Sequence, residues 1–184
     1  MQNNKPLPPV LFFIFGGSGD LNYRKLTPAL YNLFLDGSMP QKFNITGIAR
    51  SEYADDAYKK HMLEGIEKFS RRKDENNKWN DFASHINYLQ LDAGNEKDFT
   101  RLADLAKQKE QELGEHPVTI FYMAVAPQLV PDIVKNLRLL PFCTNTKSTR
   151  IVIEKPFGHD LQSAREMNEL LAKYFSTAIR QWNV

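Results

Sequence analysis

The 184-residue chain has little cysteine, no long apolar run and no excess of either charge. Its single cysteine, Cys143, cannot form a disulfide within the chain, and no histidine stands beside it in sequence to activate it as a nucleophile. No stretch is long and apolar enough for a membrane span, and the N-terminus lacks the apolar region of a signal peptide. The sequence therefore predicts a cytoplasmic protein with no disulfide framework and no membrane partner.

Charge and ligand spacing exclude further classes of protein. The formal net charge is only +2, with acids and bases mixed along the chain, whereas a nucleic-acid surface usually needs a concentrated basic face. We therefore expect no nucleic-acid partner. The four histidines and the one cysteine show no metal-ligand spacing, so no metal site is predicted. No Tyr-x-x-x-Lys occurs, and the base of a short-chain reductase is therefore missing.

What the chain does contain is a regular alternation of strand-like and helix-like segments. Strands are predicted at 9–15, 43–49, 86–92, 118–125 and 150–154, and helices at 20–35, 53–72, 96–113, 131–140 and 160–175. The polar stretch 70–81 is predicted to be a solvated loop or helix end, with a binding site as the alternative. Alternation with short connections predicts a doubly wound α/β domain, Rossmann-like, with a parallel sheet between two helical layers. We expect a polar leader at 1–9, this domain at 10–176 and a divergent tail at 177–184.

The first strand runs directly into a glycine-rich turn and then a helix, with glycine at positions 16, 17 and 19. In a doubly wound fold this turn holds a pyrophosphate, because the N–H groups at the helix start are unsatisfied and glycine lets phosphate oxygens approach. Asn22 stands where the fingerprint expects a third Gly or Ala, and we expect looser helix–strand packing there. A plain capped turn without a ligand is the alternative.

The second and fifth strands end in basic residues. Arg50 and Ser51 follow the second strand, where a basic residue accommodates the 2′-phosphate of NADP. NADP is therefore predicted as the coenzyme, with NAD as the second candidate and a solvated arginine as the alternative reading. Lys155 ends the fifth strand, in the segment EKPFG, where it could meet a phosphate or a substrate hydroxyl unless it is simply a surface lysine.

Four segments, FGGSGDL, GIARS, FYMAVAP and EKPFG, occur in this order along the chain. In this order and spacing they resemble the N-terminal coenzyme domain of glucose-6-phosphate dehydrogenase, and the resemblance covers residues 10–175. It implies oxidation of the C1 hydroxyl of glucose 6-phosphate to a lactone, with hydride transfer to NADP and a histidine as general base. That reaction belongs to glucose metabolism in the pentose phosphate pathway.

The resemblance also implies roles for individual residues. The coenzyme pyrophosphate would be lined by Gly16, Ser18, Gly19, Asp20 and Leu21. The 2′-phosphate would be bound by Arg50, beside Ser51. The adenosine half would lie near Asp92 and Ala93, and the nicotinamide side near Ala126 and Pro127. The sugar phosphate would face Lys25 and Lys155, with Lys155 also near the coenzyme and the Lys155–Pro156 bond cis.

The resemblance stops before the family's motif RIDHYLGK, which this sequence lacks. A large domain that carries the general base and the dimer interface follows that motif in the family, and we expect it to be absent here. None of the histidines matches the family's base: they are His61, His85, His116 and His159. The chain is therefore predicted to bind coenzyme, to contain no catalytic residue of its own, to be inactive alone, and to self-associate through apolar surface left uncovered.

Three alternatives remain open on sequence grounds. The chain could be the Rossmann half of a glucose–fructose oxidoreductase-type enzyme, which also has a Glu-Lys-Pro motif. It could be a non-catalytic NADP-binding module that acts through a partner. It could also be a pseudogene product without a stable role.

Overall fold

The computed structural model describes residues 7–72, 78–114, 116–140 and 148–154, together with the single helical positions 162, 165 and 169. Its strands are β1 (Val10–Phe15), β2 (Phe43–Ala49), β3 (Ile86–Gln90), β4 (Val118–Met123) and β5 (Thr149–Ile153). They form one sheet in the order β3-β2-β1-β4-β5, and every neighbouring pair is parallel. The predicted doubly wound sheet is confirmed, with β1 at its centre.

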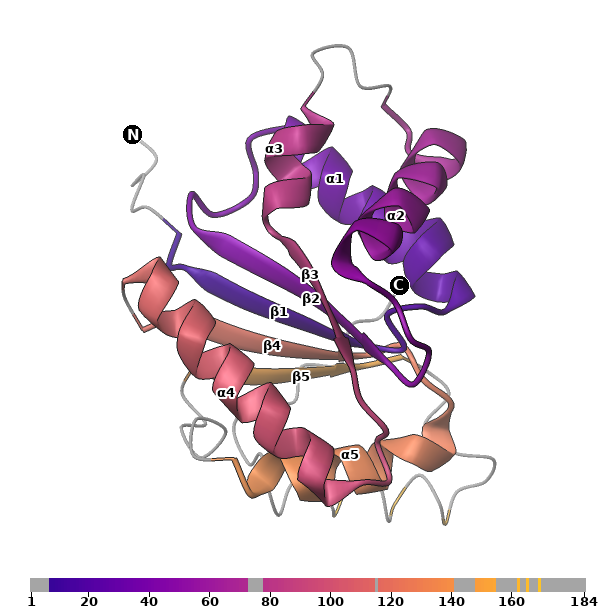
Figure 1. Ribbon diagram of the computed structural model, residues 1–184, viewed down its shortest axis with the longest axis vertical. Coiled ribbons are helices and arrows are strands. Elements are labelled where there is room, and N and C mark those ends of the chain that lie inside the picture. The colour runs from indigo at the N-terminus through magenta and orange to yellow at the C-terminus, as the bar shows by residue number, and fades with distance from the viewer. Residues whose placement is uncertain are drawn as a thin grey trace.

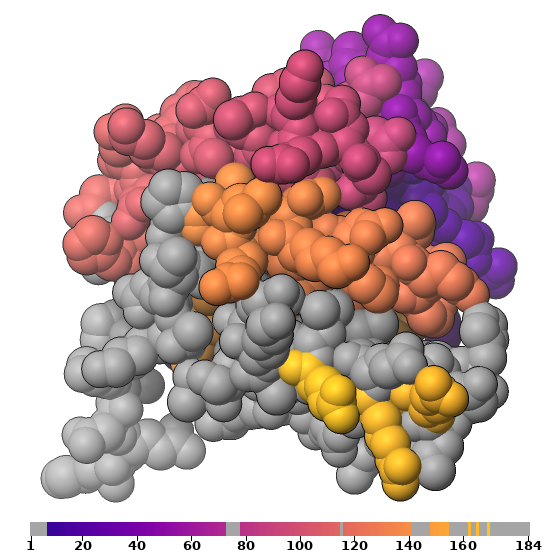
Figure 2. Space-filling view, turned by 90° about the horizontal axis from the view of Figure 1, so that it is seen from below, coloured from indigo at the N-terminus to yellow at the C-terminus, as the bar shows by residue number. Residues whose placement is uncertain are grey.

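Helices cover both faces of this sheet (Figure 1). A π turn (Asn22–Leu26) leads into α1 (Thr27–Leu35), and α2 (Asp55–Phe69) and α3 (Trp79–Ser84) lie on the same face. The other face carries α4 (Glu96–Leu113) and α5 (Val130–Arg138), the latter preceded by a 3-10 turn (Pro127–Leu129). Figure 2 shows α4 and α5 side by side. The described part of the chain therefore has the predicted three layers.

Two apolar clusters fill the spaces between the sheet and its helices. The cluster under α4 and α5 includes Phe13, Phe15, Phe99, Leu102 and Phe121. The cluster under α1, α2 and α3 includes Ile14, Ile45, Tyr58, Met62 and Phe82. Successive residues of a strand point to opposite faces of the sheet, so Phe13 and Phe15 enter one cluster and Ile14 the other. This two-sided burial is the physical reason why the first apolar run is continuous.

The predicted elements agree with the structure except in the polar stretch 70–81. That stretch was expected to be a solvated loop or helix end, and its last three residues begin a separate helix, α3, whose Phe82 is fully buried. Phe82 packs edge-on against Tyr31 of α1, with ring centroids 5.1 Å apart, so tertiary packing stabilises a helix that local polarity does not favour.

Several expectations fall outside the described residues. They are the first six residues of the leader, Cys143, Lys155 with its expected cis bond, and the tail 177–184. Of the helix predicted at 160–175, the three described positions are helical. No helix in the described ranges is long and apolar enough to cross a membrane.

Candidate functional site

The glycine turn closes off β1 and is held by the neighbouring strand. The amide nitrogens of Gly16 and Gly17 both donate to the carbonyl of Ile48 in β2, at 2.8 and 2.9 Å. Gly16 has φ +85°, a conformation that L residues rarely adopt. The amide of Gly19 then donates to the Gly16 carbonyl at 2.8 Å, and the amide of Tyr23 donates to the Gly19 carbonyl as the helix begins. The turn and helix start therefore lie at the carboxyl edge of the central strand, as predicted.

Two of the glycines are required by packing inside the protein. A Cβ on Gly16 would overlap the carbonyl oxygen of Ala124, which follows β4. A Cβ on Gly17 would lie 2.5 Å from the Cα of Gly47 in β2. The turn thus packs between the chain segments of β2 and β4, the two strands that flank β1. This close packing explains why positions 16 and 17 are glycine.

Asn22 packs tightly, and the expectation of looser packing at this position is wrong. Its side chain is fully buried, and its Nδ2 donates to the Gly17 carbonyl at 2.7 Å and to the Tyr58 hydroxyl at 3.0 Å. Its Oδ1 accepts from the Thr27 hydroxyl at 2.9 Å. Burying an amide costs little when all its polar atoms are paired, and this amide joins the turn to α1 and α2.

Arg50 and Ser51 follow β2 beside the glycine turn. The Ser18 hydroxyl donates to the Ser51 hydroxyl at 3.5 Å. This contact brings the predicted pyrophosphate site at the glycine turn next to the predicted 2′-phosphate site after β2. The Tyr88 hydroxyl donates to the Ser51 carbonyl at 2.5 Å, and Gln90 donates to the Arg50 carbonyl at 3.1 Å. The Arg50 backbone is therefore fixed, whereas its exposed guanidinium has no partner among the described residues. Such a group can bind an anion without first breaking an ion pair.

Asp92 and Ala93 lie just past β3, next to β2 in the sheet. The amide of Asp92 donates to the Asp98 carboxylate at 2.9 Å, and one oxygen of its own carboxylate accepts from the Gly94 amide at 3.0 Å. Asn136 of α5 donates to the Ala93 carbonyl at 3.1 Å. The loop after β3 is therefore tied to both α4 and α5, and Asp92 remains exposed at the strand-end edge.

Ala126 and Pro127 follow β4 on the other side of β1. Pro127 opens the 3-10 turn before α5, and the Ala124 amide donates to the Phe15 carbonyl at 2.9 Å. The Tyr122 hydroxyl donates to the carboxylate of Glu154, which follows β5. Burial, and then this hydrogen bond, raise the pKa of the Tyr122 phenol above its usual range. This pair joins the ends of β4 and β5 and was missed by the sequence reasoning, because its members lie 32 positions apart.

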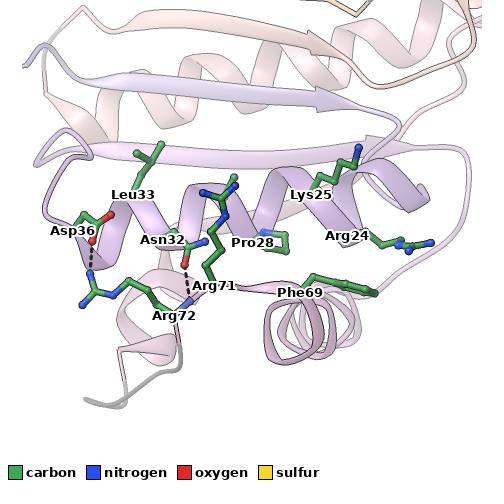
Figure 3. A pocket seen from close by; sticks show the side chains of 10 residues that line it. Arg24, Lys25, Pro28, Asn32, Leu33, Asp36, Phe69, Arg71 and Arg72 are labelled. Carbon is green, nitrogen blue, oxygen red and sulfur yellow. Dashed lines mark hydrogen bonds and ion pairs between the residues drawn. The ribbon is translucent and has the colours of Figure 1, made fainter. Parts of the chain in front are cut away.

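Lys25 lies in the π turn, where its exposed side chain borders a groove of about 680 Å³ between α1 and the end of α2. In Figure 3 its ammonium group points away from Phe69 and Arg72, which also line the groove. Arg72 pairs with Asp36 there, and the Arg24 guanidinium stands 5.1 Å from the centre of the Phe69 ring. No contact in the described residues ties Lys25 to the strand-end turns, so its predicted role toward a sugar phosphate stays a prediction.

Three of the four histidines lie in the described ranges, and each contacts another side chain or the backbone. His61 on α2 stacks on Tyr23, with ring centroids 4.5 Å apart. His85 precedes β3 and contacts the Phe43 carbonyl at 3.1 Å, while His116 precedes β4 and pairs with Glu110. His85 and His116 stand before the first residues of β3 and β4, at the opposite edge from the one where a coenzyme would lie, whereas His61 also stacks on Tyr53, which follows Ser51 by two positions. The described residues also contain no group of side chains that could hold a metal ion.

The fold and this edge define a doubly wound dinucleotide-binding domain. A parallel sheet of this order binds its ligand outside the carboxyl ends of the strands. The site lies where the strand order reverses: the chain passes from β1 to β2 on one side of β1, and later returns from β3 to β4 on the other side. The predicted contact residues of the described part lie on this edge, with the exception of Lys25 on its adjoining helix.

Comparison with known proteins identifies the family. The model of the glucose-6-phosphate dehydrogenase NAD binding domain matches residues 13–179. The glucose-6-phosphate 1-dehydrogenase of Rhizobium meliloti is 34% identical over 171 residues, which are 92% of this chain and 33% of the relative. That of Chlamydia pneumoniae is 30% identical, over 93% of this chain and 34% of the relative.

Solved structures agree with these matches. A glucose-6-phosphate dehydrogenase in complex with its substrate glucose 6-phosphate has a TM-score of 0.79 at 31% identity, covering 96% of this chain and 36% of that one. The enzyme from Mycobacterium avium gives 0.76 at 26% identity, over 91% and 34% of the two chains.

The chain therefore belongs to the NAD-binding domain family of glucose-6-phosphate dehydrogenase. It spans about a third of the length of the curated relatives that it matches. A nicotinamide dinucleotide is the class of coenzyme that this family domain binds, and the family inferred from the four sequence segments is confirmed.

Proposed function

We propose that this chain is the coenzyme-binding domain of an NADP-dependent glucose-6-phosphate dehydrogenase. The observation that supports this most strongly is the glycine turn at the end of β1 beside the exposed guanidinium of Arg50, for which the described part of the chain provides no partner. The turn offers N–H groups to a pyrophosphate, and the guanidinium offers paired donors to a 2′-phosphate. These residues fit the coenzyme, which supplies the acceptor for the hydride when it is bound.

The chain's own residues would bind and orient the two halves of the coenzyme. Ser18, Gly19, Asp20 and Leu21 would line the pyrophosphate with Gly16 below them. Because Ser18 contacts Ser51 at 3.5 Å, the pyrophosphate and the 2′-phosphate would be bound by adjoining segments.

The loops that flank this turn would hold the outer parts of the coenzyme. Asp92 and Ala93 would lie at the adenosine half, since they follow β3 next to β2. Ala126 and Pro127 follow β4 on the other side of β1, where the nicotinamide would lie. The Tyr122–Glu154 pair would fix the strand ends on that side.

The substrate of the reaction would be glucose 6-phosphate, with its phosphate near Lys25 and Lys155, and its C1 hydroxyl facing the nicotinamide. Oxidation to the lactone moves a hydride from C1 to the coenzyme and a proton from the hydroxyl to a base. His85 and His116 precede β3 and β4 at the opposite edge, and His61 is stacked on Tyr23 and Tyr53, so we expect the base to come from a residue outside these three. We accordingly expect the chain to bind coenzyme in the cytoplasm without catalysing turnover alone.

Calorimetric titration of the full 184-residue chain with NADP and with NAD tests this proposal. We expect saturable binding of both, with NADP bound more tightly through the 2′-phosphate. An assay with glucose 6-phosphate and NADP should give no lactone. Failure of either dinucleotide to bind a folded chain would overturn the proposal, and equal affinities would remove the 2′-phosphate role from Arg50.

A further inference from the structure

The carbonyl of Gly17, inside the glycine turn, accepts hydrogen bonds from two different helical segments. Asn22 Nδ2 donates to it at 2.7 Å, and the Tyr58 hydroxyl of α2 donates to it at 3.0 Å. Asn22 is fully buried and Tyr58 is 1% exposed. Both lone pairs of the carbonyl oxygen are therefore used on the side of the turn that faces the protein.

The orientation of the Asn22 amide follows from its partners. A carbonyl oxygen can only accept, so the Asn22 atom that contacts Gly17 must be the amide nitrogen. That nitrogen also lies within hydrogen-bond distance of the Tyr58 hydroxyl, at 3.0 Å, and of the Met62 sulfur, at 3.4 Å, and the Thr27 hydroxyl donates to the remaining oxygen at 2.9 Å. Both polar atoms of this buried amide therefore have partners, which fixes the amide in one orientation.

A rigid Gly17 carbonyl has a direct consequence for the next residue. The peptide bond is planar and trans, so the carbonyl of Gly17 and the N–H of Ser18 belong to one plane and point in opposite directions. Because the carbonyl points into the protein toward Asn22 and Tyr58, the N–H of Ser18 points out of the turn. Two donors on the carbonyl also polarise the peptide unit, which makes its N–H a better donor.

We propose that Asn22 and Tyr58 are positioning residues that orient the Ser18 N–H toward the coenzyme pyrophosphate. This inference rests on the proposed function, since it concerns the same site. It also gives Asn22 a role. The alanine that the fingerprint allows at this position has no side-chain donor, so it could not hydrogen-bond to the Gly17 carbonyl.

The test compares two ligands that differ in their use of the turn. NADP carries the pyrophosphate, whereas 2′-AMP carries the 2′-phosphate without it. For Asn22→Ala and for Tyr58→Phe we expect NADP affinity to fall about three- to tenfold, the worth of one hydrogen bond. The affinity for 2′-AMP should change less than about twofold, so the ratio of the two dissociation constants should rise.

Thr46→Val is the matched control. Thr46 is fully buried in β2, and its hydroxyl donates to Asn44 at 3.1 Å, so the variant also loses one buried hydrogen bond. It should lower stability and leave the ratio of the two dissociation constants unchanged. An amide spectrum adds a local readout: inorganic pyrophosphate should shift the Ser18 amide resonance in the wild-type chain and shift it less in Asn22→Ala.

The outcomes separate this inference from the proposed function. If the wild type binds NADP but both variants keep the wild-type ratio and Ser18 shift, the positioning role is overturned and the coenzyme site stands. If the folded wild type binds neither NADP nor pyrophosphate, both proposals are overturned. Should Asn22→Ala fail to fold, Tyr58→Phe, which removes only a hydroxyl, decides the question.

Discussion

Gly17 lies so close to Gly47 of β2 that no side chain fits at position 17. A Cβ on Gly17 would lie 2.5 Å from the Cα of Gly47, and a Cβ on Gly47 would overlap the hydroxyl of Tyr58. The two glycines therefore let the turn after β1, β2 and α2 approach one another. The same close approach allows Tyr58 to reach the Gly17 carbonyl.

Gly17→Ala should destabilise the protein by about 1–3 kcal/mol, because the added methyl group meets backbone that cannot move aside without disturbing the sheet. Urea unfolding of the variant and the wild type measures this difference. Gly94→Ala is the matched control, since the nearest atom to its added Cβ is 3.6 Å away. It should change the free energy of unfolding by no more than about 0.5 kcal/mol. Equal losses in the two variants would contradict the close-packing argument.

Arg50→Ala should reduce NADP affinity about ten- to hundredfold, the effect of losing charge-assisted hydrogen bonds to a phosphate. NAD lacks that phosphate, so its affinity should change less than about twofold. Titration of the variant with both coenzymes measures the two effects. Arg101→Ala removes another exposed arginine, from α4 on the opposite helical layer, and serves as the control. Parallel losses for NADP and NAD would show that Arg50 acts on something other than the 2′-phosphate.

The fold could be predicted from the sequence because each strand is apolar enough to be recognised alone. The continuous run around Phe13 and the helical spacing of Phe99 and Leu102 depend only on local pattern and on burial. The end of β2 was also predictable, since the position of Arg50 relative to a strand follows from a rule of the doubly wound fold. Helix α3 was not, because its burial depends on Tyr31, far away in sequence.

The place of the glycine turn at the end of β1 could be predicted from the sequence, but the side-chain hydrogen bonds around it could not. Asn22 was expected to loosen the packing, but it is fully buried and hydrogen-bonded. Its partner Tyr58 lies 36 positions away on a highly charged helix, so the sequence did not reveal the contact. The spacing of Tyr58, Met62 and Ile66 indicates a buried face, but a pattern of burial does not reveal which polar atom a hydroxyl will meet. The Tyr122–Glu154 pair was missed for the same reason.

Self-association, expected from sequence, should involve the side of the sheet near β5. Among the described strands β5 pairs with β4 alone, and Leu129 and Leu139 beside α5 are 40% and 61% exposed. Light scattering should give an apparent mass that rises with concentration, and Leu139→Lys should reduce that rise. Leu33→Lys, on α1 across the sheet and 44% exposed, is the control and should not. A constant monomer mass across the concentration range would contradict this prediction.

Stability should fall in alkali because of Tyr58. Burial, above all, raises the pKa of its phenol above the usual range, whereas in the unfolded chain the phenol ionises near pH ~10. The folded state therefore holds its proton at pH values where the unfolded state has released it. The stabilisation is fully present below pH ~10 and is lost as the pH rises toward the folded pKa.

Urea unfolding between pH 8 and pH 11 measures this loss, which for one such group approaches about 1.4 kcal/mol for each pH unit above the unfolded pKa. Tyr58→Phe cannot ionise, so its stability should decline less steeply than that of the wild type, although it starts lower because the Gly17 carbonyl loses a donor. If the variant declined as steeply as the wild type, the alkaline sensitivity would have to come from other groups, and Tyr58 would have to be accessible enough to ionise in the folded state.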